Sequence, residues 1–319
     1  MNRPTLEDIY QARARIAGTV RRTPLEYSEW LSELARCDVY LKLESQHKTR
    51  SFKVRGATNA VAALAPADRA RGLVTASAGN HGQAVALAAR SVGAKATVFV
   101  PGSAPETKKD RIRLLGADLR CVDGTYDDAQ DAARGFAEDR GATFVHAFTN
   151  PDVVAGQGTV GLEIVEEIPR VREVIVPVGG GGLIAGIGTV MKTIADGDVR
   201  VIGVQTDQTS AMYSAFVAGH VVDVAIGPTL ADGLAGHVDD VSYQRAQRVT
   251  DQMWLVDEAA LPEAIRALYR RDGLVVEGAG AVGVAAILEQ RLELRGPAVI
   301  VISGGNIDGS RLAEILTAE

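Results

Sequence analysis

Short apolar runs alternate with helical patterns over most of the chain, and this alternation constrains the fold more than any other feature. Leu73–Ala76 and Ala96–Val100 are the first two runs, and further runs follow near 119–122 and 143–145. The segments between them are long enough for crossover helices, which parallel strands require. The sequence therefore predicts an α/β fold with two open, twisted, mostly parallel sheets that carry helices on both faces.

After Asn150-Pro151 the alternation resumes with longer segments between the apolar runs. Strands are expected near 174–176, 201–204, 253–256 and 298–302. The segment from 222 to about 252 is expected to be mostly loop. A chain of 319 residues has room for about two domains. We expect a small α/β domain at 48–149, set into a large domain formed by 1–47 and 150–319.

Charge and composition exclude several classes of protein. The net charge is −6, and without a basic stripe we expect no nucleic-acid partner. Val174–Met191 is uncharged but contains a glycine run that would expose unpaired backbone groups in lipid, so we expect no membrane span. The N-terminus lacks the apolar core of a signal peptide, and Cys37 and Cys121 are too few for a disulfide scaffold or a cysteine zinc site. A cytoplasmic protein is expected.

Four consecutive glycines, Gly179, Gly180, Gly181 and Gly182, stand between an expected strand and a helix that starts at Leu183. Such a turn lets the backbone approach a ligand closely, and the helix N-terminus adds a partial positive charge. The turn is therefore a candidate phosphate cradle. The alternative is a turn that only permits tight packing.

A second glycine pattern, Gly278 to Gly283, matches G-x-G-x-x-G and raises the possibility of a nicotinamide-dependent dehydrogenase. That class needs an acid at the end of the following strand for the ribose hydroxyls. The expected strand ends instead in Ser303-Gly304-Gly305-Asn306, and Glu277 would repel a pyrophosphate. The pattern favours a dehydrogenase only weakly.

The third turn, Ser77-Ala78-Gly79-Asn80-His81-Gly82, lies where an expected strand gives way to a helix. Exposed N–H groups at such a point suit a carboxylate, and the Asn80 side chain can donate to a ring oxygen. A plain helix cap is the alternative interpretation.

Lys53 falls in the first turn of an expected helix whose apolar face includes Val54, Ala57 and Val61, with Thr49 or Ser51 as its cap. Partial burial and the helix dipole would both lower the pKa of the amine. An amine activated in this way suits Schiff-base chemistry. A solvated surface lysine is the alternative.

Several motifs occur together in a fixed order. They are Lys42-Leu43-Glu44, Ser51-Phe52-Lys53-Val54-Arg55-Gly56-Ala57, the Ser77–Gln83 turn, Ala155-Gly156-Gln157-Gly158-Thr159, the tetraglycine turn, Ala231-Asp232-Gly233-Leu234-Ala235 and Ser303-Gly304-Gly305-Asn306. This set resembles the pyridoxal-phosphate enzymes of the threonine dehydratase and serine racemase family, which have the fold of the tryptophan synthase β-subunit (fold type II). The resemblance covers about Leu6 to Asp308.

The resemblance implies that pyridoxal 5'-phosphate binds in the cleft between the domains, with Lys53 as the Schiff-base lysine that also moves the substrate Cα proton. The other implied cofactor contacts are Phe52 beside the ring, Asn80 on the ring oxygen, Gly179, Gly180, Gly181, Gly182 and Leu183 on the phosphate, and Ser303 at the ring nitrogen. The implied substrate-carboxylate site is Ser77, Ala78, Gly79, Asn80 and His81.

A serine at the ring nitrogen is too weak an acid to keep it protonated, which disfavours a long-lived carbanion and suits β-elimination. The racemase branch has a serine where this chain has Ala78, and racemisation needs a proton donor on each face of Cα. We therefore expect dehydration of an L-3-hydroxy amino acid, threonine or serine first, to a 2-oxo acid and ammonia. Phenylserine, 3-hydroxyaspartate, a serine racemase-like activity and a catalytically silent ligand-binding protein remain alternatives.

Other positions depart from the family's pattern. Gln205 and Ala211 occupy the places of acidic metal ligands, so we expect no metal. Most dehydratases have glycine where this chain has Arg50, and the sequence alone offers no reason for the difference. The chain ends soon after Asp308, so no C-terminal effector domain is expected. The resemblance implies a homodimer or homotetramer.

Overall fold

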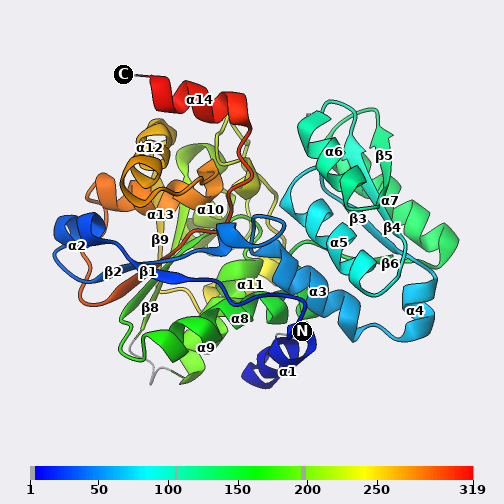
Figure 1. Ribbon diagram of the computed structural model, residues 1–319, viewed down its shortest axis with the longest axis horizontal. Helices are drawn as coiled ribbons and strands as arrows, with labels where there is room; N and C mark the ends of the chain where they lie inside the picture. Colours follow the sequence, from blue (N-terminus) through cyan, green and yellow to red (C-terminus); the bar gives the residue numbers. More distant parts are fainter. Residues whose placement is uncertain (1–3, 105, 195–198, 319) are drawn as a thin grey trace.

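The computed structural model describes residues 4–104, 106–194 and 199–318 and contains two open sheets (Figure 1). The strands of the larger sheet are β1 (Leu25–Tyr27), β2 (Val39–Lys42), β7 (Glu173–Pro177), β8 (Arg200–Thr206), β9 (Gln252–Val256) and β10 (Ala298–Val301). The strands of the smaller sheet are β3 (Leu73–Ala76), β4 (Ala96–Pro101), β5 (Asp118–Val122) and β6 (Thr143–Phe144).

The strand order is β1-β2-β10-β7-β8-β9 in the larger sheet and β5-β4-β3-β6 in the smaller one. Among the described residues only the β1–β2 pair is antiparallel, and the other neighbours run parallel. The predicted fold class, α/β with two open and mostly parallel sheets, is therefore confirmed.

Helices cover both sheets. Those around the larger sheet are α1 (Leu6–Ile16), α2 (Glu29–Ala35), α8 (Pro151–Glu167), α9 (Gly182–Ile194), α10 (Ala211–Ala218), α11 (Asp240–Gln247), α12 (Leu261–Asp272), α13 (Gly278–Leu288) and α14 (Gly309–Thr317), with 3-10 turns η1 (Glu44–Gln46), η2 (Asp207–Thr209), η3 (Asp232–Leu234) and η4 (Glu258–Ala260). Those between β2 and α8 are α3 (Lys53–Ala63), α4 (Pro66–Ala70), α5 (Asn80–Ser91), α6 (Glu106–Leu114) and α7 (Tyr126–Arg140).

The strands of the two sheets separate cleanly along the chain. All four strands of the smaller sheet lie between residues 48 and 149, and all six of the larger sheet lie outside that range. This separation supports our proposal of a small domain at 48–149 and a large domain formed by 1–47 and 150–319. Figure 1 shows α3 between the two sheets, where it packs on both α5 and α8.

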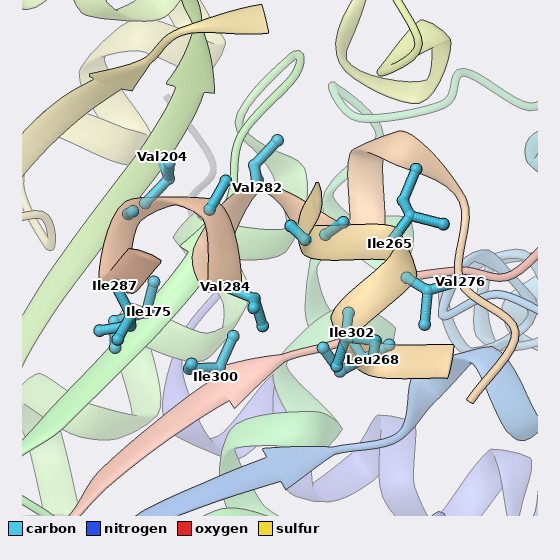
Figure 2. Close-up of a cluster of buried hydrophobic side chains, with 14 of the residues drawn as sticks. Ile175, Val204, Ile265, Leu268, Val276, Val282, Val284, Ile287, Ile300 and Ile302 are labelled. Atoms are coloured by element: carbon cyan, nitrogen blue, oxygen red, sulfur yellow. The ribbon is translucent and has the colours of Figure 1, made fainter. Parts of the chain in front are cut away.

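Alternate residues of the central strands point to opposite faces of the larger sheet, as the two-residue period of a strand requires. Ile175 and Ile300 belong to the cluster that α12 and α13 cover. Val174 and Val299 belong to the cluster that α8 and α9 cover. Figure 2 shows the first cluster, in which α13 lies against strands β7, β8 and β10. The runs are apolar throughout because both faces are buried.

The G-x-G-x-x-G segment forms the first turns of α13 and is buried inside this core, not in a dinucleotide-binding turn. A Cβ on Gly283 would lie 2.6 Å from Cγ2 of Ile300, and one on Gly280 would lie 2.7 Å from the carbonyl oxygen of Gly304. The glycines therefore let α13 pack closely on β10 and the segment after it. This packing role removes the basis for the dehydrogenase alternative.

One local prediction was incomplete. The stretch expected to be mostly loop is mostly loop, but it also contains η3 and α11, and a capping box between Asp239 and Ser242 fixes the start of α11. Helix α13 begins at Gly278, because the small residues of the glycine pattern pack tightly in a helix instead of forming a turn. In the part of the chain that the structure describes, every helix is too short or too polar to cross a bilayer.

Candidate active site

The loops at the carboxyl ends of the strands from both sheets meet around one cavity of about 450 Å³. Ligands of open parallel sheets bind at this edge, where successive connections diverge. Every residue that the sequence singled out for cofactor or substrate lines this cavity: Phe52, Lys53, Ser77, Ala78, Gly79, Asn80, His81, Gly179, Gly180, Gly181, Gly182, Leu183 and Ser303. Residues far apart in the chain are thus brought together as one candidate site.

Lys53 is the first residue of α3, and its amine reaches the cavity wall. Nζ donates to the carbonyl oxygen of Ala147 at 3.4 Å and lies 5.1 Å from the centre of the Phe52 ring. Burial lowers the pKa of the Lys53 amine to about 8, and the negative charge of Glu277 partly opposes that change. A pKa near 8 leaves a usable fraction of nucleophilic free amine near neutral pH.

The start of α3 is not capped by Thr49 or Ser51, so that prediction was wrong. Phe52 occupies the N-cap position and its side chain makes no capping bond, whereas the N–H of Gly56 in the first turn donates to Oε1 of Gln157 at 3.1 Å. Instead, the N–H of Phe52 donates to the carbonyl oxygen of Ser303 at 3.1 Å, and Ser51 forms a β-bridge with Gly304. The loop after β10 therefore fixes the position of the lysine.

A buried group of charges anchors the same helix. Arg55, two residues after Lys53, is fully buried and bonds to both Glu44 and Glu163, and Glu163 also pairs with the buried Lys42 at 2.7 Å. Burial alone would raise the pKa of Glu44, but the charges of Arg55 and His47 hold it well below its usual range. Two cations thus balance two carboxylates, and they tie the start of α3 to β2, η1 and α8.

The tetraglycine turn connects β7 to the N-terminus of α9, and side chains there would not fit. A Cβ on Gly180 would lie 2.5 Å from the ring of Phe148, and one on Gly182 would lie 3.1 Å from the Cβ of that residue. Gly181 has φ +82°, a conformation that favours glycine. The turn is a cradle of bare backbone at a helix N-terminus, which suits an anion such as phosphate.

His81 and Asn80 begin α5, directly after the loop that follows β3. His81 is buried, and its Nε2–H donates to the carbonyl oxygen of Val145 at 2.9 Å. Burial lowers the pKa of His81 to about 3, with the charge of Lys53 acting in the same direction. The ring therefore stays neutral and fixes the loop. Asn80 Nδ2 donates to Oε1 of Glu277 at 2.7 Å.

Ser303 follows β10 and is buried, with its Oγ 3.4 Å from the carbonyl oxygen of Ala279. The hydroxyl lies on the cavity wall and can accept or donate one hydrogen bond. The donor set fits pyridoxal phosphate: an activated amine, an amide, a hydroxyl and a glycine cradle surround one cavity. Phe52 supplies an aromatic wall beside the amine.

Several cavity residues were not among the predicted site residues. Glu277, Asn306, His146 and Phe148 all line the cavity. Glu277 is buried, and burial together with the charge of Asp232 raises its pKa to about 7. The sequence contained a signal for two of them, since Asn306 ends the Ser-Gly-Gly-Asn motif and Glu277 precedes the glycines of α13. Their proximity to Asn80 is a property of the fold.

The departure at Arg50 has a backbone explanation. Arg50 has φ 53°, in the left-handed region that costs a residue with a Cβ free energy and that glycine adopts freely. The turn is held by Arg50 N–H donating to the carbonyl oxygen of His47 at 2.8 Å and by Gly305 N–H donating to the carbonyl oxygen of Arg50 at 2.9 Å. Glycine suits this conformation, and arginine occupies it here at a cost.

Comparisons with known proteins agree on one group. The family model described as pyridoxal-phosphate dependent enzyme matches residues 16–304. The chain is 46% identical to an L-threonine ammonia-lyase of Thermotoga maritima over 98% of this chain and 78% of that protein. It is 37% identical to a catabolic L-threonine dehydratase of Escherichia coli over 97% of this chain and 95% of that protein. The structure of maize serine racemase superposes with a TM-score of 0.94 at 30% identity, over 98% of this chain and 97% of that one.

Proposed function

This chain belongs to the family of pyridoxal-phosphate dependent enzymes, and we propose that it is a threonine ammonia-lyase. It converts L-threonine, and L-serine as a second substrate, to a 2-oxo acid and ammonia. The observation that carries the proposal is the meeting of Lys53, Asn80, the tetraglycine turn and Ser303 around one cavity. The identities of 46% and 37% to a threonine ammonia-lyase and a threonine dehydratase, each over nearly the whole chain, support the choice of substrate.

Pyridoxal phosphate, when bound, supplies the electron-withdrawing ring that makes the Cα–H bond of an amino acid acidic. The tetraglycine turn and Leu183, at the start of α9, would hold the phosphate. Asn80 would donate to the ring oxygen, and Ser303 would face the ring nitrogen. Lys53 would bond to the aldehyde carbon.

Lys53 is also the group that moves protons in this site. Its amine has a pKa of about 8 and lies on the cavity wall, so near neutral pH it can both accept and return a proton. The Cα proton of the substrate would pass to Lys53 Nζ, and the β-hydroxyl group would leave as water with a proton returned to it. The loop from Ser77 to His81 would bind the substrate carboxylate through its N–H groups, and the bond from Gly79 N–H to Ser77 Oγ at 3.2 Å shapes that loop.

Ala78 lines the cavity in that loop and has no proton to exchange. A reaction that uses a proton donor and acceptor on one face of Cα favours elimination over racemisation. A serine racemase-like activity is the second candidate, and the structural likeness to maize serine racemase is the observation that favours it. Ala78 is the residue that counts against it.

Release of 2-oxo acid from threonine, serine, phenylserine and 3-hydroxyaspartate tests the proposal directly, with chiral analysis of the remaining serine. Threonine should give the highest kcat/KM, and D-serine should stay at background. The Lys53→Ala variant should lose essentially all turnover. A preference for phenylserine or 3-hydroxyaspartate, or substantial D-serine formation, would overturn the assignment in favour of that alternative.

The family resemblance also supports two broader proposals. We expect a homodimer or homotetramer located in the cytoplasm. Light scattering of the purified protein tests the first, and fractionation of the source cells tests the second.

A further inference from the structure

Four side chains form a chain of hydrogen bonds along one wall of the cavity: Arg111, Asn306, Asn80 and Glu277. Arg111 and Asn80 come from α6 and α5 of the small domain, and Glu277 and Asn306 flank α13 and β10 of the large domain. Asn80, Asn306 and Glu277 reach the cavity itself. The direction of each bond follows from the Arg111 guanidinium group, which can only donate, and from the ionised Glu277 carboxylate, which can only accept.

Arg111 sets the orientation of Asn306. A guanidinium group has no acceptor, so its Nη1, 2.7 Å from Asn306, must face the amide oxygen Oδ1. Asn306 Nδ2 then points the other way and uses both of its hydrogens. One goes to the carbonyl oxygen of Thr49 at 2.8 Å and the other to Oδ1 of Asn80 at 2.6 Å.

Glu277 sets the orientation of Asn80 from the opposite side. Its Oε1 accepts from Asn80 Nδ2 at 2.7 Å, and its Oε2 accepts from the Asn306 N–H at 2.9 Å. The carboxyl group is buried and packs closely against Gly304, where even a Cβ would collide with Oε1. It therefore has little room to turn. The Asn80 amide is thus held at both ends, with its oxygen on Asn306 and its nitrogen on Glu277.

One hydrogen of Asn80 Nδ2 remains after the bond to Glu277, and Asn80 lines the cavity. A turned amide would place Oδ1 against the carboxylate of Glu277 and would present an acceptor to the ring oxygen of the cofactor, where two oxygens would repel. We propose that Arg111 and Glu277 are positioning residues that orient the Asn80 amide so that it presents an N–H to the cofactor ring oxygen. This inference rests on the proposed function, since it requires pyridoxal phosphate in the cavity.

The other charged groups near these four side chains do not replace any of their hydrogen bonds. Asp232 of η3 raises the pKa of Glu277, and Lys108 of α6, which pairs with Asp232, lowers it. Lys53 is the third charged neighbour. None of these three takes the place of the bonds from Asn80 and Asn306 to the two oxygens of Glu277.

The test compares two ligands of the apoprotein: pyridoxal phosphate and the analogue that lacks the ring 3-hydroxyl group. Dissociation constants come from quenching of the intrinsic tryptophan fluorescence. Arg111→Met and Glu277→Gln should each weaken pyridoxal phosphate binding about tenfold, the value of one hydrogen bond to a charged or partly charged oxygen. In Glu277→Gln the new side-chain NH₂ group must face either Asn80 Nδ2 or the Asn306 N–H. Both of these groups are donors, so one of the two hydrogen bonds is lost. Both variants should bind the analogue as the unmodified protein does.

Matched variants separate positioning from general damage. Arg111→Lys keeps a donor-only cation and should restore binding to within about twofold. Arg113→Met, on the exposed side of the same helix, should change neither constant. The double variant of Arg111→Met and Glu277→Gln should bind no more weakly than the worse single variant, because both act on one amide.

Equal losses for the two ligands, or unchanged binding of pyridoxal phosphate, would overturn the positioning role. If Glu277→Gln fails to fold, the two substitutions at Arg111 decide the question. Failure of the unmodified protein to bind pyridoxal phosphate at all would instead overturn the proposed function.

Discussion

Gly180 lies so close to Phe148 that a Cβ on the glycine would be 2.5 Å from the phenyl ring. Phe148 belongs to the segment between β6 and α8, whereas Gly180 belongs to the turn between β7 and α9. The ring therefore packs on the glycine cradle from the segment that follows the smaller sheet. The shape of the glycine cradle therefore depends on Phe148, which lies outside the tetraglycine motif.

This packing predicts the effect of a single methyl group. Gly180→Ala should weaken pyridoxal phosphate binding about tenfold or more, because the turn must move away from the Phe148 ring. Adding Phe148→Ala should recover part of the loss by vacating the space. Fluorescence titration of the apoprotein measures both constants.

Gly135→Ala is the matched control for this prediction. Gly135 lies within α7, and a Cβ there would meet nothing within 4 Å. It should leave cofactor binding unchanged and slightly stabilise the helix. Equal binding by the Gly180→Ala single variant and by its combination with Phe148→Ala would show that the ring does not limit the turn.

The lowered pKa of Lys53 predicts a pH profile for its reactivity. At a pKa of about 8, roughly 10% of the amine is unprotonated at pH 7, against about 0.03% for an ordinary lysine. The rate at which Lys53 is trapped by an aldehyde and borohydride should therefore rise with pH and reach half its maximum near pH 8. Mass spectrometry of the modified peptide gives the rate.

Glu277→Gln offers a check on the cause of that profile. The charge of Glu277 raises the pKa of Lys53, opposing the larger effect of burial. Its removal should move the midpoint to lower pH. A midpoint near pH 10 in the unmodified protein would mean that the amine is solvated, contrary to the structure.

Much of the fold could be predicted from the sequence because its central strands are buried on both faces. The runs at 73–76, 96–100 and 174–176 are apolar enough to stand out, and each forms the strand expected of it. Helix α11 was missed because its polar sequence shows no clear stripe, although the Asp239 and Ser242 pair that caps it is visible. Local signals therefore located the core better than its covering elements.

The candidate site was predictable only as far as its motifs extend. Lys53 and the glycines are marked by their neighbours in the sequence, so their roles could be proposed from position alone. Glu277 stands out in the sequence only as the residue before the glycines of α13, and that position does not predict its contact with Asn80, which is 197 residues away in the chain. Likewise, Arg55 and Glu163 are residue types that usually lie at the surface, yet they form an ion pair in the interior. Partners of this kind depend on tertiary packing, which sequence spacing does not encode.

The backbone at Arg50 predicts a stabilising substitution. Arg50→Gly should raise the free energy of unfolding by up to about 1 kcal/mol, because relief of the left-handed conformation outweighs the added freedom of the unfolded chain. Arg50→Val should lower it by more, since β-branched residues tolerate positive φ poorly. Urea unfolding monitored by circular dichroism compares the two. A loss of stability in Arg50→Gly would show that the arginine side chain contributes more than the strain costs.

The buried charges beside Lys53 predict a large penalty for removing one partner. Arg55→Met would leave Glu44 and Glu163 facing each other without their shared cation, and we expect a loss of about 3–5 kcal/mol of stability. The exposed pair of Arg13 and Glu166 is the comparison, and Arg13→Met should cost less than about 1 kcal/mol. Urea unfolding measures both variants. Arg55→Lys keeps the charge but loses the fork of donors, so it should fall between them. Equal effects of Arg55→Met and Arg13→Met would show that the interior pairs are hydrated and contribute no more than surface ones.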